Sequence, residues 1–486
     1  MRRNFLSTLC TLAAVIVTLA LAGCETTQPK PAAPSAAEPA EAAPEAAPED
    51  PEPVLTVPEA YDAISLSVQA GDPGAAIAAY EEAELDDPDD PATKVLLANL
   101  FLIAGETGEA VRVLDEVLAD EPENTDALYL LALVRGAEGD EDEQRRLLEG
   151  ILELDPEHTR ARAALAELQA QDRSYRDAAE NFRAVLDDEP EDLVARVGLG
   201  NVYLRQERYE EAEEELSAAI ELEPDYPFAY SDRARTRALQ YELGAAEDDL
   251  STAIELEPEF YWNYIDRGRV RLERRRFERA EADFTRAIEL NEERFLGFAL
   301  RARARDVQEE IDGALADYER ALAMRPDYSP AFAPIGVLLY MTEAFDDAFD
   351  YLERAYEEDD QRYDLALLAA LALKSGRRDQ DAADFLNGIV NSVPRDSLYY
   401  ETMRYYLQPG NEGYVMSQIR ASTDDTLKAQ MYFYVGAQLE LLGRVQTAQA
   451  AFLEAEEGLQ PGLVEWRLAR WRLRAYRSEE EENPGE

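Results

Sequence analysis

Small and apolar residues recur along most of the chain with a period of 34 residues. Proline stands at one point of this period eight times between Pro88 and Pro394, taken here as position 32 of a repeat that begins at Val57. Position 8 is Ala or Gly from Ala98 to Ala370, and position 20 is Ala in nine of ten repeats. Small residues let two helices approach closely, so each repeat is predicted to form helix A at positions 2–14 and helix B at positions 18–31. A fixed period of this length predicts a solenoid.

Bulky residues at position 24 of the repeat are expected to fill the space between helix pairs. Together with the small residues and the proline, they make the pattern similar to the tetratricopeptide repeat, or TPR. The resemblance extends from Val57 to Gly462. It implies an all-α fold, a right-handed superhelix of about twelve helix pairs. The bulky residues include Tyr80, Phe182, Phe284 and Tyr318.

The last quarter of the chain departs from the regular pattern and then recovers it. A degenerate unit has Pro409 and Gly410 in its turn region and Met416 where Ala belongs. Trp466 and Leu468 lie in a final segment that resembles the capping helix of such arrays, and an acidic tail suits an exposed end. The expected parts are ten repeats over 57–396, the degenerate repeat over 397–428, a further repeat over 429–462, the capping helix over 463–478 and the tail over 479–486.

The first 23 residues have the pattern of a secretory signal. Arg2 and Arg3 precede an apolar run that ends in Leu21-Ala22-Gly23-Cys24. These four residues resemble the lipobox of bacterial lipoproteins, which implies cleavage before Cys24 and acylation of its thiol, with palmitate as a typical chain. The alternative is an uncleaved membrane anchor, because the apolar run is nearly long enough to span a bilayer.

Residues 24–56 are rich in Pro, Ala and Glu and predict an extended tether. Some thirty residues of this kind reach roughly 80–90 Å from the lipid. Glu25 follows the lipidated cysteine. In Gram-negative lipoproteins an Asp there commonly signals retention in the inner membrane, so the resemblance favours the outer membrane of the cell envelope, on its periplasmic face or on the surface.

Charge and composition exclude several classes of function. The chain has 48 Lys and Arg against 103 Asp and Glu, a formal charge of −55, and such a surface repels nucleic acid. With one His and two Cys, the sequence offers no His/Cys zinc site and no Cys–His or Ser–His–Asp arrangement. We therefore expect no metal, no cofactor and no enzymatic activity.

In the TPR family, A-helix positions 2, 5, 9, 12 and 13 line the concave groove; we call this surface the A-helix face. Three arginines occur at position 9, 34 residues apart, beside an aromatic position 2. Because guanidinium groups bind carboxylates bidentately, this row predicts a site for an acidic segment or a terminal carboxylate. The alternative is solvated arginine balanced by neighbouring acids. The candidate residues are Asn201, Arg235, Arg269 and Arg303 at position 9, and Phe228 and Trp262 at position 2.

A second arginine row indicates a structural role. Position 7 is Arg in the same three repeats, and only there is position 23 of helix B Asp. Because the two residue types appear together, we expect an ion pair within each repeat. The pairs are Arg233 with Asp249, Arg267 with Asp283, and Arg301 with Asp317. By contrast, Arg274, Arg275 and Arg276 are expected to be solvated at a turn or to form a contact patch.

Two functional hypotheses follow. The first is a membrane-anchored scaffold or adaptor that binds an envelope protein or an acidic peptide segment in its groove. The second is a structural lipoprotein that self-assembles or acts as a spacer, with no ligand in the groove. A groove occupied by the protein's own helix, or by another copy in an oligomer, would favour the second hypothesis.

Overall fold

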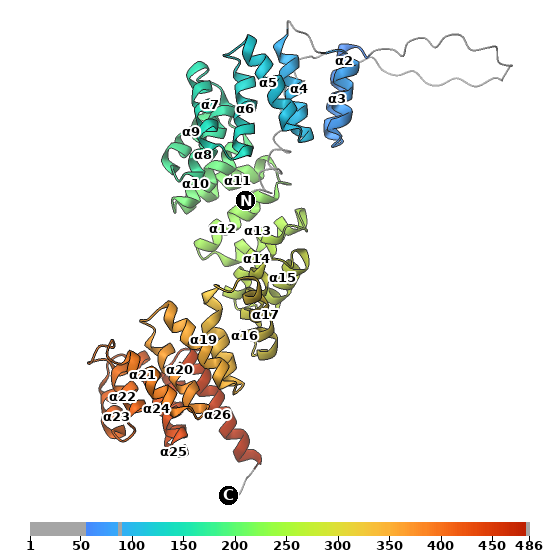
Figure 1. The fold of residues 1–486 in the computed structure, drawn as a ribbon. Helices are drawn as coiled ribbons and strands as arrows, with labels where there is room; N and C mark the ends of the chain where they lie inside the picture. The colour runs from blue at the N-terminus through green and yellow to red at the C-terminus, as the bar shows by residue number, and fades with distance from the viewer. Residues whose placement is uncertain (1–54, 86–89, 483–486) are drawn as a thin grey trace, which may run out of the picture. The chain divides into compact units, whose positions relative to one another are not determined.

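The computed structural model describes residues 55–85 and 90–482, and within these ranges the regular elements are helices. The chain divides into two compact units, Met1–Gln240 (unit 1) and Tyr241–Glu486 (unit 2) (Figure 1). The division falls between the two helices of the sixth repeat. Among the described helices, none combines the length and the apolar character needed to cross a membrane.

Unit 1 alternates A and B helices in the predicted order. Its A helices are α2 (Val57–Gln69), α4 (Pro91–Ala104), α6 (Thr125–Glu138), α8 (Thr159–Gln171), α10 (Leu193–Arg205) and α12 (Pro227–Leu239). Its B helices are α3 (Pro73–Glu82), α5 (Thr107–Asp120), α7 (Glu141–Leu154), α9 (Tyr175–Asp188) and α11 (Tyr209–Leu222).

Unit 2 begins with the B helix of repeat 6 and ends with the capping helix. Its A helices are α14 (Tyr261–Glu273), α16 (Phe295–Val307), α18 (Phe332–Met341, preceded by the 3-10 turn Ser329–Ala331), α20 (Tyr363–Ser375), α22 (Leu398–Leu407) and α24 (Asp425–Leu441). Its B helices are α13 (Leu243–Leu256), α15 (Phe277–Leu290), α17 (Ile311–Met324), α19 (Phe345–Glu358), α21 (Asp379–Ile389), α23 (Glu412–Ala421) and α25 (Val445–Gly458). The final helix is α26 (Val464–Glu482), which ends four residues after 478.

The turn between helices A and B has the same backbone conformation from repeat to repeat. Position 15 has a positive φ, with Gly71, Gly105 and Gly139 in the first three repeats. In later repeats non-glycine residues adopt it, including Arg275 (φ 57°) and Arg377 (φ 64°). Only glycine enters this region without steric penalty, so these later turns hold local strain.

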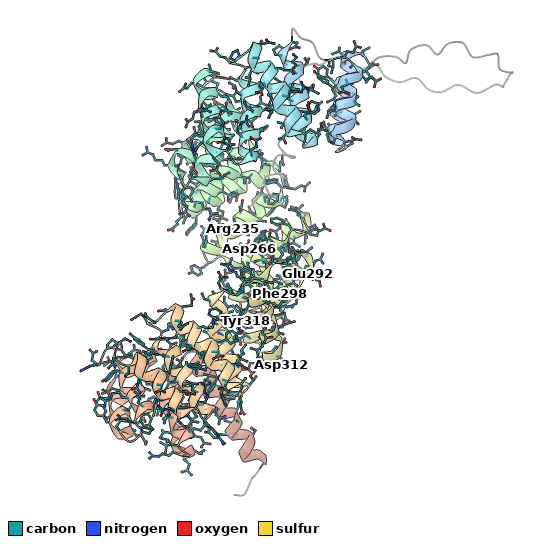
Figure 2. All side chains as sticks on the ribbon, in the orientation of Figure 1. Arg235, Asp266, Glu292, Phe298, Asp312 and Tyr318 are labelled. Carbon is teal, nitrogen blue, oxygen red and sulfur yellow. The ribbon has the colours of Figure 1, made fainter. Side chains whose placement is uncertain are left out.

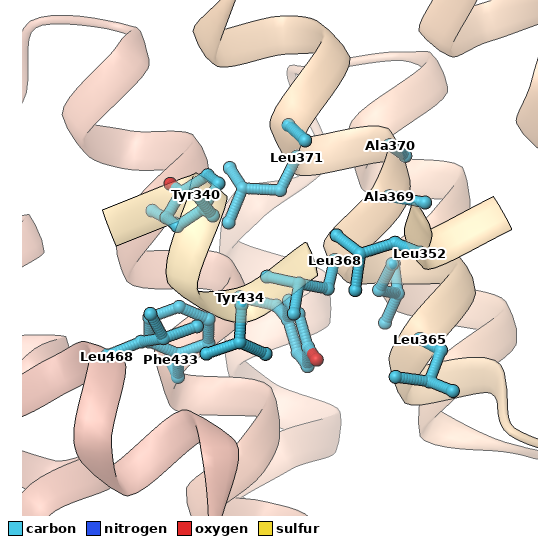
Figure 3. Close-up of a cluster of buried hydrophobic side chains, with 14 of the residues drawn as sticks. Tyr340, Leu352, Leu365, Leu368, Ala369, Ala370, Leu371, Phe433, Tyr434 and Leu468 are labelled. Atoms are coloured by element: carbon cyan, nitrogen blue, oxygen red, sulfur yellow. The ribbon is translucent and has the colours of Figure 1, made fainter. Parts of the chain in front are cut away.

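Small and large residues interlock within each repeat as predicted. A Cβ added to Gly268 at position 8 would lie 2.4 Å from the Phe284 ring at position 24. Close approach of α14 and α15 therefore requires the glycine. In unit 2 the largest buried cluster joins side chains of α18, α20, α24 and α26, with Tyr340, Leu371, Phe433 and Leu468 among its members (Figure 3).

Candidate functional site

In unit 1, two predicted site residues share one carboxylate on the A-helix face. Asn201 Nδ2 donates to Asp232 Oδ2 (2.8 Å), and Arg235 Nη1 donates to Asp232 Oδ1 (3.0 Å). Asp232 lies one helical turn before Arg235, so this arginine has an acidic partner on its own helix. Phe228 is half-buried, with its ring centroid 5.6 Å from that of Tyr226.

Repeat 4 has a carboxylate at position 9, Glu167, which is not among the predicted site residues. Glu167 is partly exposed and makes no hydrogen bond or ion pair among the described side chains. Burial, and to a smaller extent the charge of Asp192, raises the pKa of Glu167 to about 7. The face of unit 1 therefore carries a carboxylate that is partly neutral near pH 7. The repeat pattern alone could have identified Glu167 as a candidate, because it precedes Asn201 by one period of 34 residues.

In unit 2, Trp262 and Arg269 lie on α14. Trp262 is 36% exposed, and the Arg294 guanidinium lies over its ring at 5.1 Å from the centroid. Arg269 is exposed, with its Nη1 3.8 Å from Asp266 Oδ1, a long ion pair. Asp266 is labelled in Figure 2. Asp266 corresponds to Asp232 in the preceding repeat. Both Arg235 and Arg269 are therefore balanced by an aspartate on the same helix.

Arg303 on α16 differs from the other two arginines. The residue three positions earlier is Leu300 rather than Asp. Arg303 is exposed and makes no ion pair or hydrogen bond within the described part of the chain. The structure brings Trp262, Arg269 and Arg303 into one unit, whereas Arg235 belongs to the other.

Beyond Arg303, the A-helix face is covered by α26. Arg467 Nη1 lies 2.5 Å from Asp306 Oδ1, and Arg474 Nη1 lies 2.7 Å from Glu309 Oε2. The ring centroids of Trp471 and Tyr340 are 6.0 Å apart. The sequence predicted that this helix closes the array, but not that it reaches 161 residues back to repeat 8.

The predicted ion pairs between helices A and B are confirmed in repeats 7 and 8. Arg267 Nη2 lies 2.8 Å from Asp283 Oδ1, and Arg301 Nη2 lies 2.7 Å from Asp317 Oδ1. The two aspartates are 3% and 4% exposed, so these pairs are interior contacts. The corresponding pair of repeat 6 spans the two units and stays a prediction.

A third arginine row, at position 11, was missed. Arg271 contacts Glu247 (2.9 Å) and Asp283 (2.7 Å), and Arg305 contacts Glu281 (2.7 Å) and Asp317 (2.9 Å). Each of these arginines therefore joins the B helix of its own repeat to that of the preceding one. The signal was the 34-residue spacing of Arg at position 11 and Glu at position 21.

The expectation that the Arg274–Arg276 run is solvated or a contact patch is wrong for two of its members. Arg274 and Arg276 both pair with Glu247 Oε2, at 2.6 and 2.8 Å. Burial acts to raise the pKa of Glu247, but the hydrogen bond from Arg271 and the charges of the three arginines hold it below its usual value. Glu247 comes from the preceding repeat, so these contacts fasten repeats 6 and 7 together.

Two open hollows occur at turns between repeats. One, of about 450 Å³, is lined by Glu121, Pro122, Glu123 and Asn124. The other, of about 350 Å³, includes Phe332, Arg354, Glu357 and Glu358. Within 55–85 and 90–482, no group of three His, Cys, Asp or Glu residues is arranged to hold a metal ion. The predicted lipidation site, Cys24, lies outside the described residues.

Comparison with protein families identifies the repeats. Two family models, both described as tetratricopeptide repeat, match residues 67–134 and 169–234, and residues 265–329 and 299–363. The chain thus contains tetratricopeptide repeats, and its all-α fold is a TPR solenoid, as predicted. This fold is typically a non-catalytic scaffold for protein–protein interaction.

Solved structures give matches of low overall similarity. YrrB, titled a TPR protein with an unusual peptide-binding site, is 21% identical, with 40% of this chain and 99% of that chain covered and a TM-score of 0.35. Pseudomonas aeruginosa PilF is 21% identical, with 45% and 97% covered and a TM-score of 0.37. PilW, titled a type IV pilus biogenesis factor, is 19% identical, with 43% and 96% covered and a TM-score of 0.36. No curated protein matches the chain.

Proposed function

We propose that the protein is a membrane-anchored scaffold that binds a partner protein on its A-helix face. The observation that carries the proposal is a change in exposure at position 9 within unit 2. Arg269 and Arg303 are exposed, whereas Val337 and Leu371 in the next two repeats are 3% and 0% exposed. In unit 2, a partner can therefore contact the position 9 side chains of repeats 7 and 8 but not those of repeats 9 and 10.

The chemistry of this exposed part favours an acidic segment of the partner. Residues 261–294 carry nine Arg against eight acids, in a chain with a formal charge of −55. Most of these arginines are paired, although Arg269 has only a long ion pair. Arg303, which lies outside this range, makes no ion pair among the described side chains. Trp262 offers an aromatic surface next to them, suited to an apolar side chain of the same segment.

The amino-terminal sequence supports a lipid anchor. Acylation at Cys24 would hold the protein to the membrane, and two or more acyl chains make such anchoring stable. The Pro/Ala/Glu-rich residues 25–54 would then separate the repeats from the membrane surface. We propose the outer membrane of the cell envelope as the location, because no Asp follows Cys24.

The second candidate function, a self-assembling or spacer lipoprotein, has one observation in its favour. Helix α26 lies on the A-helix face from α16 to α18, so the chain itself occupies part of the surface that would bind a ligand. The exposed face of repeats 7 and 8 favours the scaffold over this alternative.

The decisive test is capture of envelope proteins by the full-length chain in detergent. The variant Arg235→Glu/Arg269→Glu/Arg303→Glu should lose its main partner. A control with three exposed arginines outside the face, Arg173→Glu/Arg377→Glu/Arg420→Glu, has the same net charge and should retain it. Equal capture by both variants would argue against the arginine row, and recovery of only the protein itself would favour self-assembly.

The anchor is tested separately by Cys24→Ser. This variant should move from the membrane fraction to the soluble fraction, because the acylated thiol is absent. Continued membrane association would support the uncleaved anchor instead.

A further inference from the structure

Three arginines of α26 lie on one face of that helix. Arg467, Arg470 and Arg474 are spaced by three and four residues, which places them one above the other. The first and third bind acids at the end of α16 and in the turn after it, namely Asp306 and Glu309. The middle one therefore faces the same edge of α16.

Arg470 makes no ion pair among the described side chains. It is exposed, and its guanidinium lies 5.1 Å from the centroid of the Trp466 ring. The hydrogen bond from Arg474 is the main reason that the pKa of Glu309 is lowered, and the charges of Arg467 and Arg470 act in the same direction. Arg470 therefore lies within electrostatic reach of Glu309, in the turn after α16, but forms no ion pair with it.

Arg303 lies on α16 itself. It lies one helical turn before Asp306, whose carboxylate is bound by Arg467. Burial and the charge of Asp306 raise the pKa of Tyr318, and the charges of Arg303 and Arg467 both act against that rise. The junction of α16 and α26 thus has two guanidinium groups, of Arg303 and Arg470, that no described carboxylate neutralises.

The composition of α26 is unusual for this chain. Residues 464–478 contain five Arg and one Glu, a local charge of +4, whereas the last four residues of α26, 479–482, are all Glu and bring the net charge of the whole helix to zero. The positive charge of α26 therefore lies in the part of the helix that contacts Asp306 and Glu309, and its negative charge lies mainly at its end. This concentration of positive charge would attract an acidic segment to this position and repel it from the remainder of the surface.

We propose that α26 forms part of the partner site, with Arg470 and Arg303 together binding carboxylates of an acidic peptide segment. The segment would lie along α14 and α16 and end against α26, with Trp262 available to an apolar side chain. This inference rests on the proposed function and assigns the partner's chemistry. It also gives α26 two roles, since one face completes the core of unit 2 through Leu468 while another contacts the ligand.

The proposal predicts that Arg470 contributes to binding as strongly as Arg303. The probe is a fluorescein-labelled peptide with the repeated sequence Glu-Glu-Leu. It is titrated with the full-length chain in detergent, and binding is followed by fluorescence anisotropy. Arg470→Glu and Arg303→Glu should each weaken binding about tenfold or more, because each replaces a charge-assisted contact by repulsion. The matched control is Arg477→Glu, an exposed arginine on the same face of α26 but two turns beyond Arg470, which should change the affinity less than about twofold.

The outcomes separate this inference from the proposed function. Loss with Arg303→Glu but not with Arg470→Glu overturns the role of α26 and leaves the scaffold proposal standing. Undiminished binding by both variants overturns both proposals for this face. Arg470→Gln, which should also weaken binding, guards against a misfolded variant, and its helicity is checked by circular dichroism. Binding of phosphatidylglycerol vesicles but not of the peptide would identify an anionic lipid surface and overturn the assignment to a peptide.

Discussion

Within unit 2, repeats 7 and 8 differ from repeats 9 and 10 at the same positions of the repeat. Position 7 is Arg267 and Arg301 in the first pair of repeats and Ile335 and Ala369 in the second. Position 9 is Arg269 and Arg303 in the first pair and Val337 and Leu371 in the second. One pair has charged residues inside and on its face, and the other is apolar in both places.

The difference teaches that the surroundings of a helix, and not only the repeat, determine which residues it presents. At position 9 the side chains of repeats 7 and 8 meet solvent, whereas Val337 and Leu371 are buried where α26 and α24 complete the core. At position 7 the arginines are partly buried, with side chains 15% exposed, and each pairs with the buried aspartate that position 23 supplies. Repeats 9 and 10 replace that aspartate by Tyr351 and Phe385.

The largest expected effect comes from breaking the charged interior of repeat 7. Asp283→Ala should lower the free energy of unfolding by about 3–5 kcal/mol, because Arg267 and Arg271 lose a shared, buried carboxylate. Chemical denaturation followed by circular dichroism measures the loss.

A double variant makes repeat 7 resemble an apolar repeat. Arg267→Leu/Asp283→Leu removes both charges, and Arg271 keeps its contact with Glu247. Repeat 3 has Leu131 and Leu147 at these positions. We expect a stability within about 1 kcal/mol of the parent chain. A loss as large as that of Asp283→Ala would mean that charge itself, rather than correct pairing, holds these repeats together.

A smaller effect is expected where α26 covers the face. Arg467→Ala leaves the half-buried Asp306 without its partner and should destabilise unit 2 by about 2 kcal/mol at pH 8. Hydrogen exchange should locate the loss in α26 and α16. If α26 is held by its apolar face alone, exchange there will be unchanged.

The same variant has a predictable pH dependence. Burial raises the pKa of Asp306 and Arg467 opposes this effect, so removal of the arginine raises the pKa further. A carboxyl group with a raised folded-state pKa favours the folded state when protonated, and this contribution is lost as the pH rises through that pKa. The destabilisation by Arg467→Ala should therefore be smaller at pH 5 than at pH 8, and Asp306→Asn in the same chain should remove the difference.

The sequence predicted the fold well because each repeat is determined by local packing. Contacts between helices adjacent in the chain determine the spacing of Ala, Gly and Pro. They also determine the pairing of Arg267 with Asp283. The contact of Arg467 with Asp306 spans 161 residues and has no period, so nothing in the repeat indicates it. The balance of Arg269 by Asp266 was foreseen only as an alternative, because side-chain pairing three residues apart competes with solvation on nearly equal terms.

The smallest effect tests what the two pairs of repeats have in common. Arg275 in repeat 7 and Arg377 in repeat 10 are exposed and have left-handed backbones, with φ of 57° and 64°. Arg275→Gly and Arg377→Gly should each relieve about 1–2 kcal/mol of steric strain, and the greater freedom of glycine in the unfolded chain offsets about 0.5–1 kcal/mol of this. The net gain in the free energy of unfolding should be about 0.5–1 kcal/mol and equal in the two variants. Both gains are measured side by side by denaturation. Unequal gains would show that the charged residues of repeat 7 and the apolar residues of repeat 10 affect the stability of the turn as well as that of the helices.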